Sequence, residues 1–316
     1  IGILCTTNDK LDHYVSLLLQ QHPIESKLPA KLVDNLNAEI SLGTVTNVEE
    51  GVQWLGYTYL NVRMRQNPFA YGIDWKELAE DPLLVQRRRE MIITAARKLH
   101  SLQMIIFDER STALTPKDLG RIASDFYLLN DSIEVFNQAL SPRATEADVL
   151  STISMSSEFD NIKFREEEST ELKQLLEEKM SCEIGSGLET SQGKTNILLQ
   201  AYISRALIKD SALVSDSNYV AQNASRICRS LFLIGISRRW GLFSRIMLSI
   251  CKSIDKQIWA YAHPINQFDL PKQIIRQIES KNTPMSELRE LNSSELGDLV
   301  HNGRMGNVLY KLIGRF

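Results

Sequence analysis

Apolar residues recur at intervals of three and four along most of the chain, and this period predicts a mainly helical protein. In the first hundred residues it predicts four helices, at residues 9–21, 27–42, about 46–67 and 81–102. Gly43 is expected to cap the second helix, because glycine readily adopts the left-handed conformation at helix ends. Thr46-Asn47-Val48-Glu49 is expected to form a capping box that opens the third helix, and Arg87-Arg88-Arg89-Glu90 is expected to lie on the outside of the fourth.

Two short segments have the composition of β-strands. Ile1–Leu4 is expected to be a buried strand, the last one of a domain that precedes the chain, and a processed or trimmed natural terminus is the alternative. Gln103–Asp108 is expected to pair with a return strand that begins at Leu114. Helices followed by a short hairpin predict a winged helix. Winged helices bind DNA or pack against other domains, and packing is favoured here because no basic face is obvious.

From Thr115 onward the pattern predicts only helices and short loops. Thr115 can cap a helix, Pro116 suits its first position, and Asp118 meets the positive end of its dipole. A helical bundle is predicted, with helices at residues 119–129, 132–138, 145–154, 168–180, 194–208, 217–239 and 242–262. After His263-Pro264, four short helices are predicted at residues 271–280, 284–291, 294–300 and 307–313.

Composition fits a folded protein of more than one domain. The chain has 316 residues, 43% of them hydrophobic and 24% charged, and roughly 100–200 residues make one domain. Four scattered cysteines predict free thiols in a reducing compartment. No apolar run approaches the roughly 20 residues that span a bilayer, so no contact with a membrane is expected. The net charge of −3 shows no overall basic excess that would indicate nucleic acid.

Motifs for catalysis or metal binding fail on spacing. Gly187 to Thr195 resembles a phosphate-binding loop, but five residues separate its glycines where the motif needs four. Gly193 is therefore predicted to lie at the start of a helix. The five histidines are dispersed, and no His or Cys pair has the spacing of metal ligands. The sequence predicts no catalytic residue, no metal site and no bound cofactor in this chain.

One segment stands out by charge. Residues 218–256 carry seven Lys or Arg against Asp255 alone. Ile227, Leu231 and Ile234 mark the core side of a helix there, while a different face is expected to carry Gln222, Arg226 and Arg229, flanked by Asn223 and Ser230. Guanidinium groups suit phosphate oxygens, and amides suit sugar and base edges. Alternatively, these arginines pair with the acidic run at residues 158–178, which holds eight acids and three bases and is expected to be a solvated face.

Several stretches resemble large DExH-box helicases of superfamily 2. Three of them are similar to the region just after the second RecA-like domain: Ile24–Ser26, Asp34–Ile40 and Trp54–Leu60. Leu119–Ser124 resembles the opening of the accessory module that follows, and Leu42–Glu50 is most similar to the first cassette of the activating signal cointegrator complex helicases in their fungal form. Spliceosomal and archaeal repair helicases share this module, as does, more distantly, a translocon subunit of the endoplasmic reticulum.

The resemblance implies a division of the chain into four parts. Residues 1–25 would be the end of the second RecA-like domain and a linker, 26–114 a winged helix, 115–264 a helical bundle, and 265–316 a helix-loop-helix domain. Tyr219–Arg226 matches the family's ratchet helix, and Asn223 and Arg226 match its strand-contacting positions. The motifs for ATP and Mg²⁺ would lie in RecA-like domains outside this chain.

The function that the resemblance implies is that of an accessory module in an ATP-dependent RNA helicase. The module would guide and grip single-stranded RNA during 3′-to-5′ translocation through Gln222, Asn223, Arg226 and Arg229. Implied partners are the RecA-like domains and second cassette of the parent, subunits of the signal cointegrator complex, and the ribosome. The implied role is in ribosome quality control. The implied location is the cytoplasm, and also the nucleus. Two alternatives stay open: a protein-docking scaffold without catalysis, and a spliceosomal paralogue.

Overall fold

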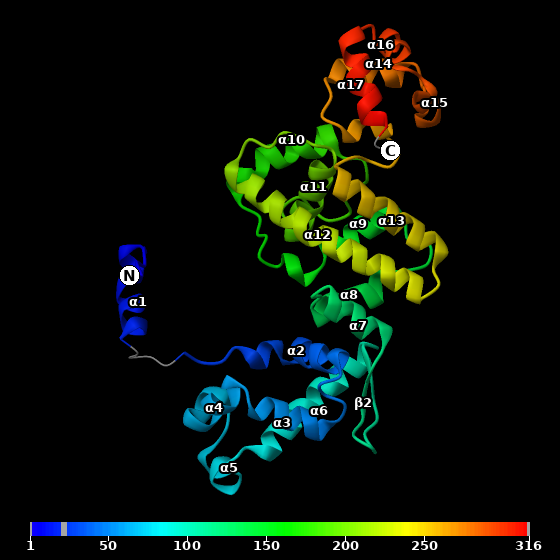
Figure 1. Ribbon diagram of the computed structural model, residues 1–316. Coiled ribbons are helices and arrows are strands. Elements are labelled where there is room, and N and C mark those ends of the chain that lie inside the picture. The colour runs from blue at the N-terminus through cyan, green and yellow to red at the C-terminus, as the bar shows by residue number, and fades with distance from the viewer. Residues whose placement is uncertain (1, 20–23, 315–316) are drawn as a thin grey trace. The chain divides into compact units, whose positions relative to one another are not determined.

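A computed structural model describes residues 2–19 and 24–314, and its contacts divide the chain into two compact units (Figure 1). The first unit ends at Asn130 and the second begins at Asp131. The described residues are predominantly helical and contain one small two-stranded sheet, which confirms the predicted mainly α fold. None of the described helices is both long and apolar enough to cross a membrane.

The first unit is built from short helices and one hairpin. Its helices are α1 (Leu11–Leu18), α2 (Leu28–Leu42), α3 (Val48–Gly56), α4 (Tyr59–Gln66), α5 (Trp75–Glu80), α6 (Val85–Ser101) and α7 (Asp118–Asp125). Strands β1 (Ile105–Phe107) and β2 (Leu114–Pro116) pair antiparallel, with Ile106 opposite Thr115. The predicted hairpin is therefore present, and Gly43 caps α2 at φ +80° as expected.

The third predicted helix is in fact two helices, and its cap lies one residue later than expected. Asn47 is the N-cap of α3, and its side chain accepts a hydrogen bond from the Glu50 amide. Glu50 in turn accepts from the amide of Thr46 at 2.7 Å. The chain leaves the helix at Tyr57 and resumes at α4, because extended Thr58 bonds back to the carbonyl of Leu55. The sequence also missed α5 entirely.

Arg88 corrects the prediction that residues 87–90 of α6 lie outside. Its side chain is buried, and its guanidinium donates to the carbonyl oxygens of Val52, Leu83 and Leu84. Val52 lies within α3, and Leu83 and Leu84 come just before α6. A carbonyl oxygen has two lone pairs, so it can accept from the guanidinium in addition to a backbone amide. Gly56 makes room, since a Cβ at this position would lie 2.4 Å from an Arg88 nitrogen.

The start of the chain is not a buried strand in the described residues. Gly2–Thr7 has no regular secondary structure, and Ile3 and Leu4 are exposed. A single strand without a neighbour cannot satisfy its backbone groups internally, so exposure to water is the expected alternative. Ile1 lies outside the described residues, as do positions 20–23 at the end of the first predicted helix.

The second unit begins with α8 (Asn130–Ala139) crossing the boundary and contains a bundle and a smaller helical cluster. The bundle has α9 (Glu146–Ser154), α10 (Ser169–Lys179), α11 (Ser191–Ile203), α12 (Ser211–Ser237) and α13 (Gly241–Lys256). The helices after it are α14 (Lys272–Ser280), α15 (Met285–Glu290), α16 (Ser293–Leu299) and α17 (Gly303–Ile313). They enclose an apolar core of their own, which includes Ile278, Leu288, Leu296 and Leu309.

Three helices of the bundle differ in their bounds from the prediction. α11 begins at Ser191 and ends at Ile203, where residues 194–208 were predicted. α12 begins six residues earlier than expected, because Asp210 caps it by accepting from the amides of Ala212 and Leu213. α13 ends at Lys256 rather than near residue 262, because Gln257 adopts the left-handed conformation at φ +52°. Residues 257–267 therefore form a loop that folds back beside α13, and this loop takes part in the pocket described below.

Candidate nucleic-acid interface

The predicted ratchet segment lies in the middle of the 27-residue helix α12. One side of α12 is buried against α11 and α13, and it includes Val220, Ala224, Ile227, Leu231 and Ile234. The predicted core positions Ile227, Leu231 and Ile234 are at most 2% exposed, so the face assigned to the core is confirmed. Ser230, expected to flank the polar face, is buried and bonds to the carbonyl of Ile227.

The predicted binding residues lie on the other side of the same helix. At about 100° per residue, Gln222, Arg226 and Arg229 fall within a sector of about 60°. Gln222 and Arg229 are exposed, and Arg226 is half-buried at the edge of this sector. Asn223, also half-buried, lies about 60° beyond Arg226, toward the core side of the helix. The three residues of the sector and Asn223 beside them are hereafter the α12 ridge (Gln222, Asn223, Arg226 and Arg229).

Asn223 holds the Arg226 guanidinium in place. Its Nδ2 donates to the carbonyl of Tyr219 at 3.0 Å, and its Oδ1 accepts from Arg226 Nη2 at 2.6 Å. Tyr219 is fixed in turn, since its hydroxyl donates to the carbonyl of Glu158 at 3.0 Å. Because the arginine is oriented by a neighbour on its own helix, less side-chain freedom is lost when it binds a ligand.

Arg229 pairs with Asp255 of α13 rather than with the acidic run. Its Nη2 lies 2.6 Å from Asp255 Oδ2, and the Ser225 hydroxyl donates to the other oxygen at 3.1 Å. The Asp255 carboxylate raises the pKa of Arg229 above its usual value. The pair is open to solvent, with 56% of the arginine side chain exposed, and exposed ion pairs contribute at most about 1 kcal/mol. A phosphate can therefore replace Asp255 at little cost.

The acidic run at residues 158–178 is only partly the solvated face that was expected. Glu158 and Glu168 are buried, as are Leu172 and Leu175. Glu158 accepts from the Ser132 hydroxyl. Glu168 lies 2.6 Å from the Nζ of Lys194, whose side chain is completely buried. These carboxylates serve the interior of the second unit instead of facing water.

The same lysine, from the glycine-rich segment at residues 187–195, is bonded within the interior of the second unit. Lys194 Nζ also lies 2.7 Å from Asp216 and 3.1 Å from the carbonyl of Lys163, so its three donors are all used. Gly193 lies in the first turn of α11, as predicted, and Thr190 caps that helix. A Cβ at Gly193 would lie 2.2 Å from the carbonyl oxygen of Gly187, so the loop is closed against its own backbone.

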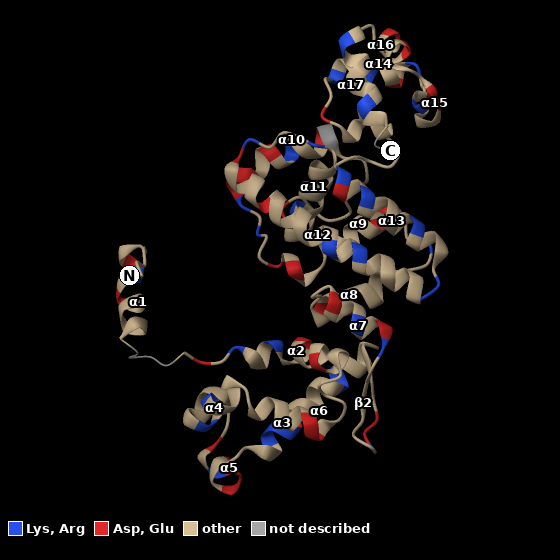
Figure 2. Cartoon of the chain, viewed as in Figure 1, with Lys and Arg blue, Asp and Glu red and all other residues tan. Residues whose placement is uncertain are grey.

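The other cations of residues 218–256 do not join the α12 ridge. Arg238 stacks over Trp240, 5.0 Å from the ring centre, and bonds to Asn137, and burial lowers its pKa. Arg245, Lys252 and Lys256 lie on α13, where Figure 2 shows basic positions recurring along the helix. Charge counting alone could not separate these groups, because it ignores which helix carries each residue.

Within the described part of the chain, no cluster of His, Cys, Asp and Glu could hold a metal ion.

Two family models match the chain. The model described as the Sec63 Brl domain matches residues 116–293, more than half of the chain. A model described as a winged helix-turn-helix domain matches residues 25–101.

Individual relatives match over nearly the whole chain. The RQC trigger complex helicase SLH1 of Saccharomyces cerevisiae is 67% identical over 315 residues, all of this chain but 16% of the relative. Activating signal cointegrator 1 complex subunit 3 of Mus musculus is 48% identical, over 96% of this chain and 14% of the relative. The human U5 small nuclear ribonucleoprotein 200 kDa helicase is 42% identical, over 100% of this chain and 15% of the relative. The chain thus spans 14–16% of the length of these relatives.

Proposed function

Because the chain belongs to the Sec63 Brl family found in DExH-box RNA helicases, we propose that it is a strand-gripping accessory module of such a helicase. In this proposal the α12 ridge contacts single-stranded RNA during 3′-to-5′ movement. The single observation that carries it is the arrangement of Gln222, Asn223, Arg226 and Arg229 on one accessible side of a helix whose other side is core.

The chemistry of the ridge suits a strand of any sequence. Arg226 and Arg229 present planar guanidiniums that fit phosphate oxygens, and Gln222 presents an amide that can donate and accept. Such contacts address the backbone, and a motor that moves along RNA needs binding of this kind. The exposed pair between Arg229 and Asp255 gives the strand an exchangeable contact instead of a permanent one.

Hydrolysis of ATP is assigned to RecA-like domains of the parent helicase, which would also hold Mg²⁺. The residues of this chain that come nearest to a phosphate loop do not suit that role, because Lys194 is enclosed by two carboxylates. In the proposal, the winged helix at residues 26–114 attaches the bundle at 115–264 to the motor, with the helix-loop-helix domain at 265–316 beyond it.

The test replaces one ridge arginine in a full-length helicase that contains this chain. Arg226→Leu removes a charge and the bond to Asn223, and it is expected to reduce strand unwinding much more than basal ATP hydrolysis. Arg289→Leu, an exposed arginine on α15, is the matched control and should change neither rate. An equal loss of unwinding and hydrolysis in Arg226→Leu would contradict a gripping role.

The names of the relatives extend the proposal to a cellular setting. SLH1 is named as a helicase of the RQC trigger complex, and the mouse relative as a subunit of the activating signal cointegrator 1 complex. By analogy we place this module on stalled ribosomes in the cytoplasm, with subunits of such a complex and a second helicase cassette as partners. The spliceosomal relative, at 42% identity, keeps a nuclear role as the alternative.

A second candidate function is a scaffold that docks other proteins. It is favoured by exposed aromatic residues in the first unit, where Phe69 and Trp75 form an edge-to-face pair and Tyr57 is 92% exposed. Single-stranded RNA binding and ribosome association, both measured on the purified chain, separate the two functions. Ribosome association without RNA binding would support the scaffold.

A further inference from the structure

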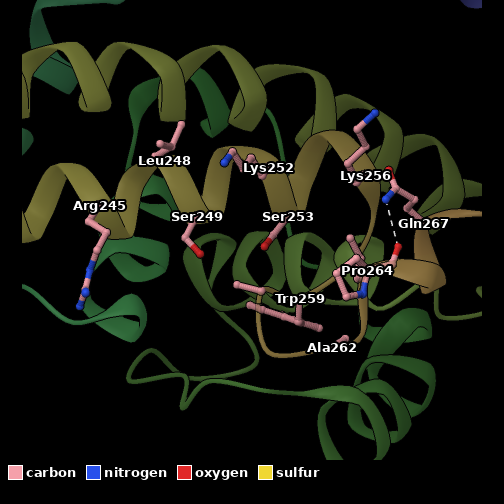
Figure 3. A pocket seen from close by; sticks show the side chains of 12 residues that line it. Arg245, Leu248, Ser249, Lys252, Ser253, Lys256, Trp259, Ala262, Pro264 and Gln267 are labelled. Atoms are coloured by element: carbon pink, nitrogen blue, oxygen red, sulfur yellow. Dashed lines mark hydrogen bonds between the residues drawn. The ribbon is translucent and has the colours of Figure 1, made fainter. Parts of the chain in front are cut away.

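A pocket of about 380 Å³ lies between helix α13 and the loop that follows it (Figure 3). Ser249 and Ser253 project from α13 toward Trp259 on the loop, while the side chains of Lys252 and Lys256 extend away from Trp259. Leu248, Ile258 and Pro264 add apolar walls. Binding pockets for small molecules have volumes of roughly 300–1,000 Å³, so the space suits a single nucleotide.

The charge of the lining is entirely positive. Arg245, Lys252 and Lys256 contribute to it, and none of its residues is acidic. Among the described residues, these three cations have no carboxylate within ion-pair distance, in a chain whose net charge is −3. Anions are therefore attracted to the pocket, and they need not displace an internal partner to bind.

Hydrogen-bond donors complete the lining. In the described part of the structure, neither the Ser249 nor the Ser253 hydroxyl has a partner. Both lie on the same flank of α13 as Arg245, at intervals of four residues along the helix. Cations and hydroxyls together match the oxygens of a phosphodiester.

Trp259 forms a rigid floor. Its indole Nε1 donates to the Ser204 hydroxyl at 2.9 Å, and its ring lies parallel to that of Tyr261, with centroids 6.2 Å apart. A fixed aromatic side chain next to cations is the combination that single-stranded nucleic acids bind, since bases pack on aromatic groups and phosphates on cations.

The pocket is adjacent to the α12 ridge around the circumference of α13. Viewed down the axis of α13, four residues follow one another around the helix in the order Asp255, Lys252, Lys256 and Ser253. Asp255, the partner of Arg229, lies about 60° before Lys252, while Lys256 lies about 40° and Ser253 about 100° after it. A strand that displaces Asp255 from Arg229 therefore meets Lys252 and Lys256 next, and then the mouth of the pocket.

We propose that the α13 pocket binds one nucleotide of the single-stranded RNA held by the α12 ridge, with its phosphate near Lys252 and Lys256 and its base toward Trp259. This inference rests on the proposed RNA-binding function of α12. An acidic peptide is disfavoured, because carboxylates need only the cations and leave the aromatic floor and the apolar walls without a role.

The test measures binding of a fluorescent oligouridylate of about twelve nucleotides to the purified 316-residue chain by anisotropy, across a salt series. Each phosphate neutralised on a single strand contributes about 0.7 to the log–log salt slope. Lys252→Gln/Lys256→Gln is expected to lower that slope by about 0.7, the contribution of the one phosphate that the two lysines share, and to weaken binding about tenfold at low salt. Lys173→Gln/Lys209→Gln makes the same charge change at exposed positions of the second unit and should leave the slope unchanged.

A ridge variant, Gln222→Ala/Arg226→Leu, separates failure of this inference from failure of the proposed function. If it weakens binding while the Lys252/Lys256 pair does not, the pocket assignment is overturned and the ridge stands. If only the Lys252/Lys256 pair weakens binding, the pocket stands and the gripping role of α12 is lost. Equal effects of the Lys252/Lys256 and Lys173/Lys209 variants on RNA binding would overturn the pocket. The pocket would also be overturned if an oligoglutamate peptide required Lys252 for binding and RNA did not.

Discussion

At the scale of single residues, the half-buried carboxylate of Glu25 accepts hydrogen bonds from three side chains of the first unit. It accepts from Arg63 at 2.8 Å, from Asn67 at 2.8 Å and from the Tyr71 hydroxyl at 2.7 Å. These donors stabilise the charged form, with Arg63 contributing most, and they lower the pKa of Glu25 from 4.5 to about 2. Glu25 thus links the segment before α2 to α4 and to the turn that follows it.

This network predicts a pH dependence of stability. A carboxyl whose pKa is lowered by folding contributes stability that is complete above about pH 4.5 and is lost as the pH falls toward about 2. Glu25→Gln should therefore lower the free energy of unfolding at neutral pH, and the difference from the unmodified chain should shrink across that acidic range. Urea unfolding followed by tryptophan fluorescence at several pH values measures this difference in the free energy of unfolding. Glu80→Gln, at an exposed position, controls for the loss of one charge, and a difference independent of pH would contradict the prediction.

At the scale of elements, Lys194 joins three helical segments of the second unit. It lies on α11, and its two carboxylate partners come from η4 (Glu166–Glu168) just before α10 and from the first half of α12. Arg165 shares both carboxylates, at the surface end of the cluster. The cluster therefore fixes the N-terminal half of α12, the helix that carries the ridge, against the rest of the bundle.

Removal of this lysine should destabilise the unit strongly. Lys194→Met fills similar space but leaves Glu168 and the half-buried Asp216 without their central cation, and breaking a buried pair in this way costs about 3–5 kcal/mol. Chemical denaturation of the variant and the unmodified chain gives the loss in free energy of unfolding. Lys173→Met, at an exposed position of α10, is the control and should change stability by less than about 0.5 kcal/mol. A loss below 1 kcal/mol in Lys194→Met would show that the cluster is not a structural anchor.

At the scale of the whole molecule, the chain divides into two compact units, which meet in sequence at Asn130 and Asp131. The contacts place α7 in the first unit, although the predicted bundle starts at residue 115. Asn37 of α2 donates to the carbonyl of Gly120 at 2.9 Å, and a Cβ at Gly120 would lie 2.3 Å from the carbonyl oxygen of Met104. Glycine at this position permits the close packing of α7 on the first unit.

A chain of two compact units predicts two unfolding transitions. Compact units of one chain are cooperative by themselves and can open independently. Glu25→Gln should therefore shift only the transition of the first unit, and Lys194→Met only that of the second. Hydrogen exchange resolved by peptide, with α6 and α11 as reporters, distinguishes the two. A simultaneous shift of both reporters by either variant would show that the units unfold as one.

The sequence by itself determined the helical class, the faces of α12 and the shared face of Gln222, Arg226 and Arg229, because these depend on spacing between near neighbours in one helix. Its resemblance to DExH-box helicases was sufficient to identify the family. Only the tertiary structure decided that Arg229 faces Asp255, that Lys194 and Arg88 are buried, and that the loop after α13 closes a basic pocket. Each of these features joins residues far apart in the chain, or depends on a backbone turn such as Gln257, and no local period encodes such contacts.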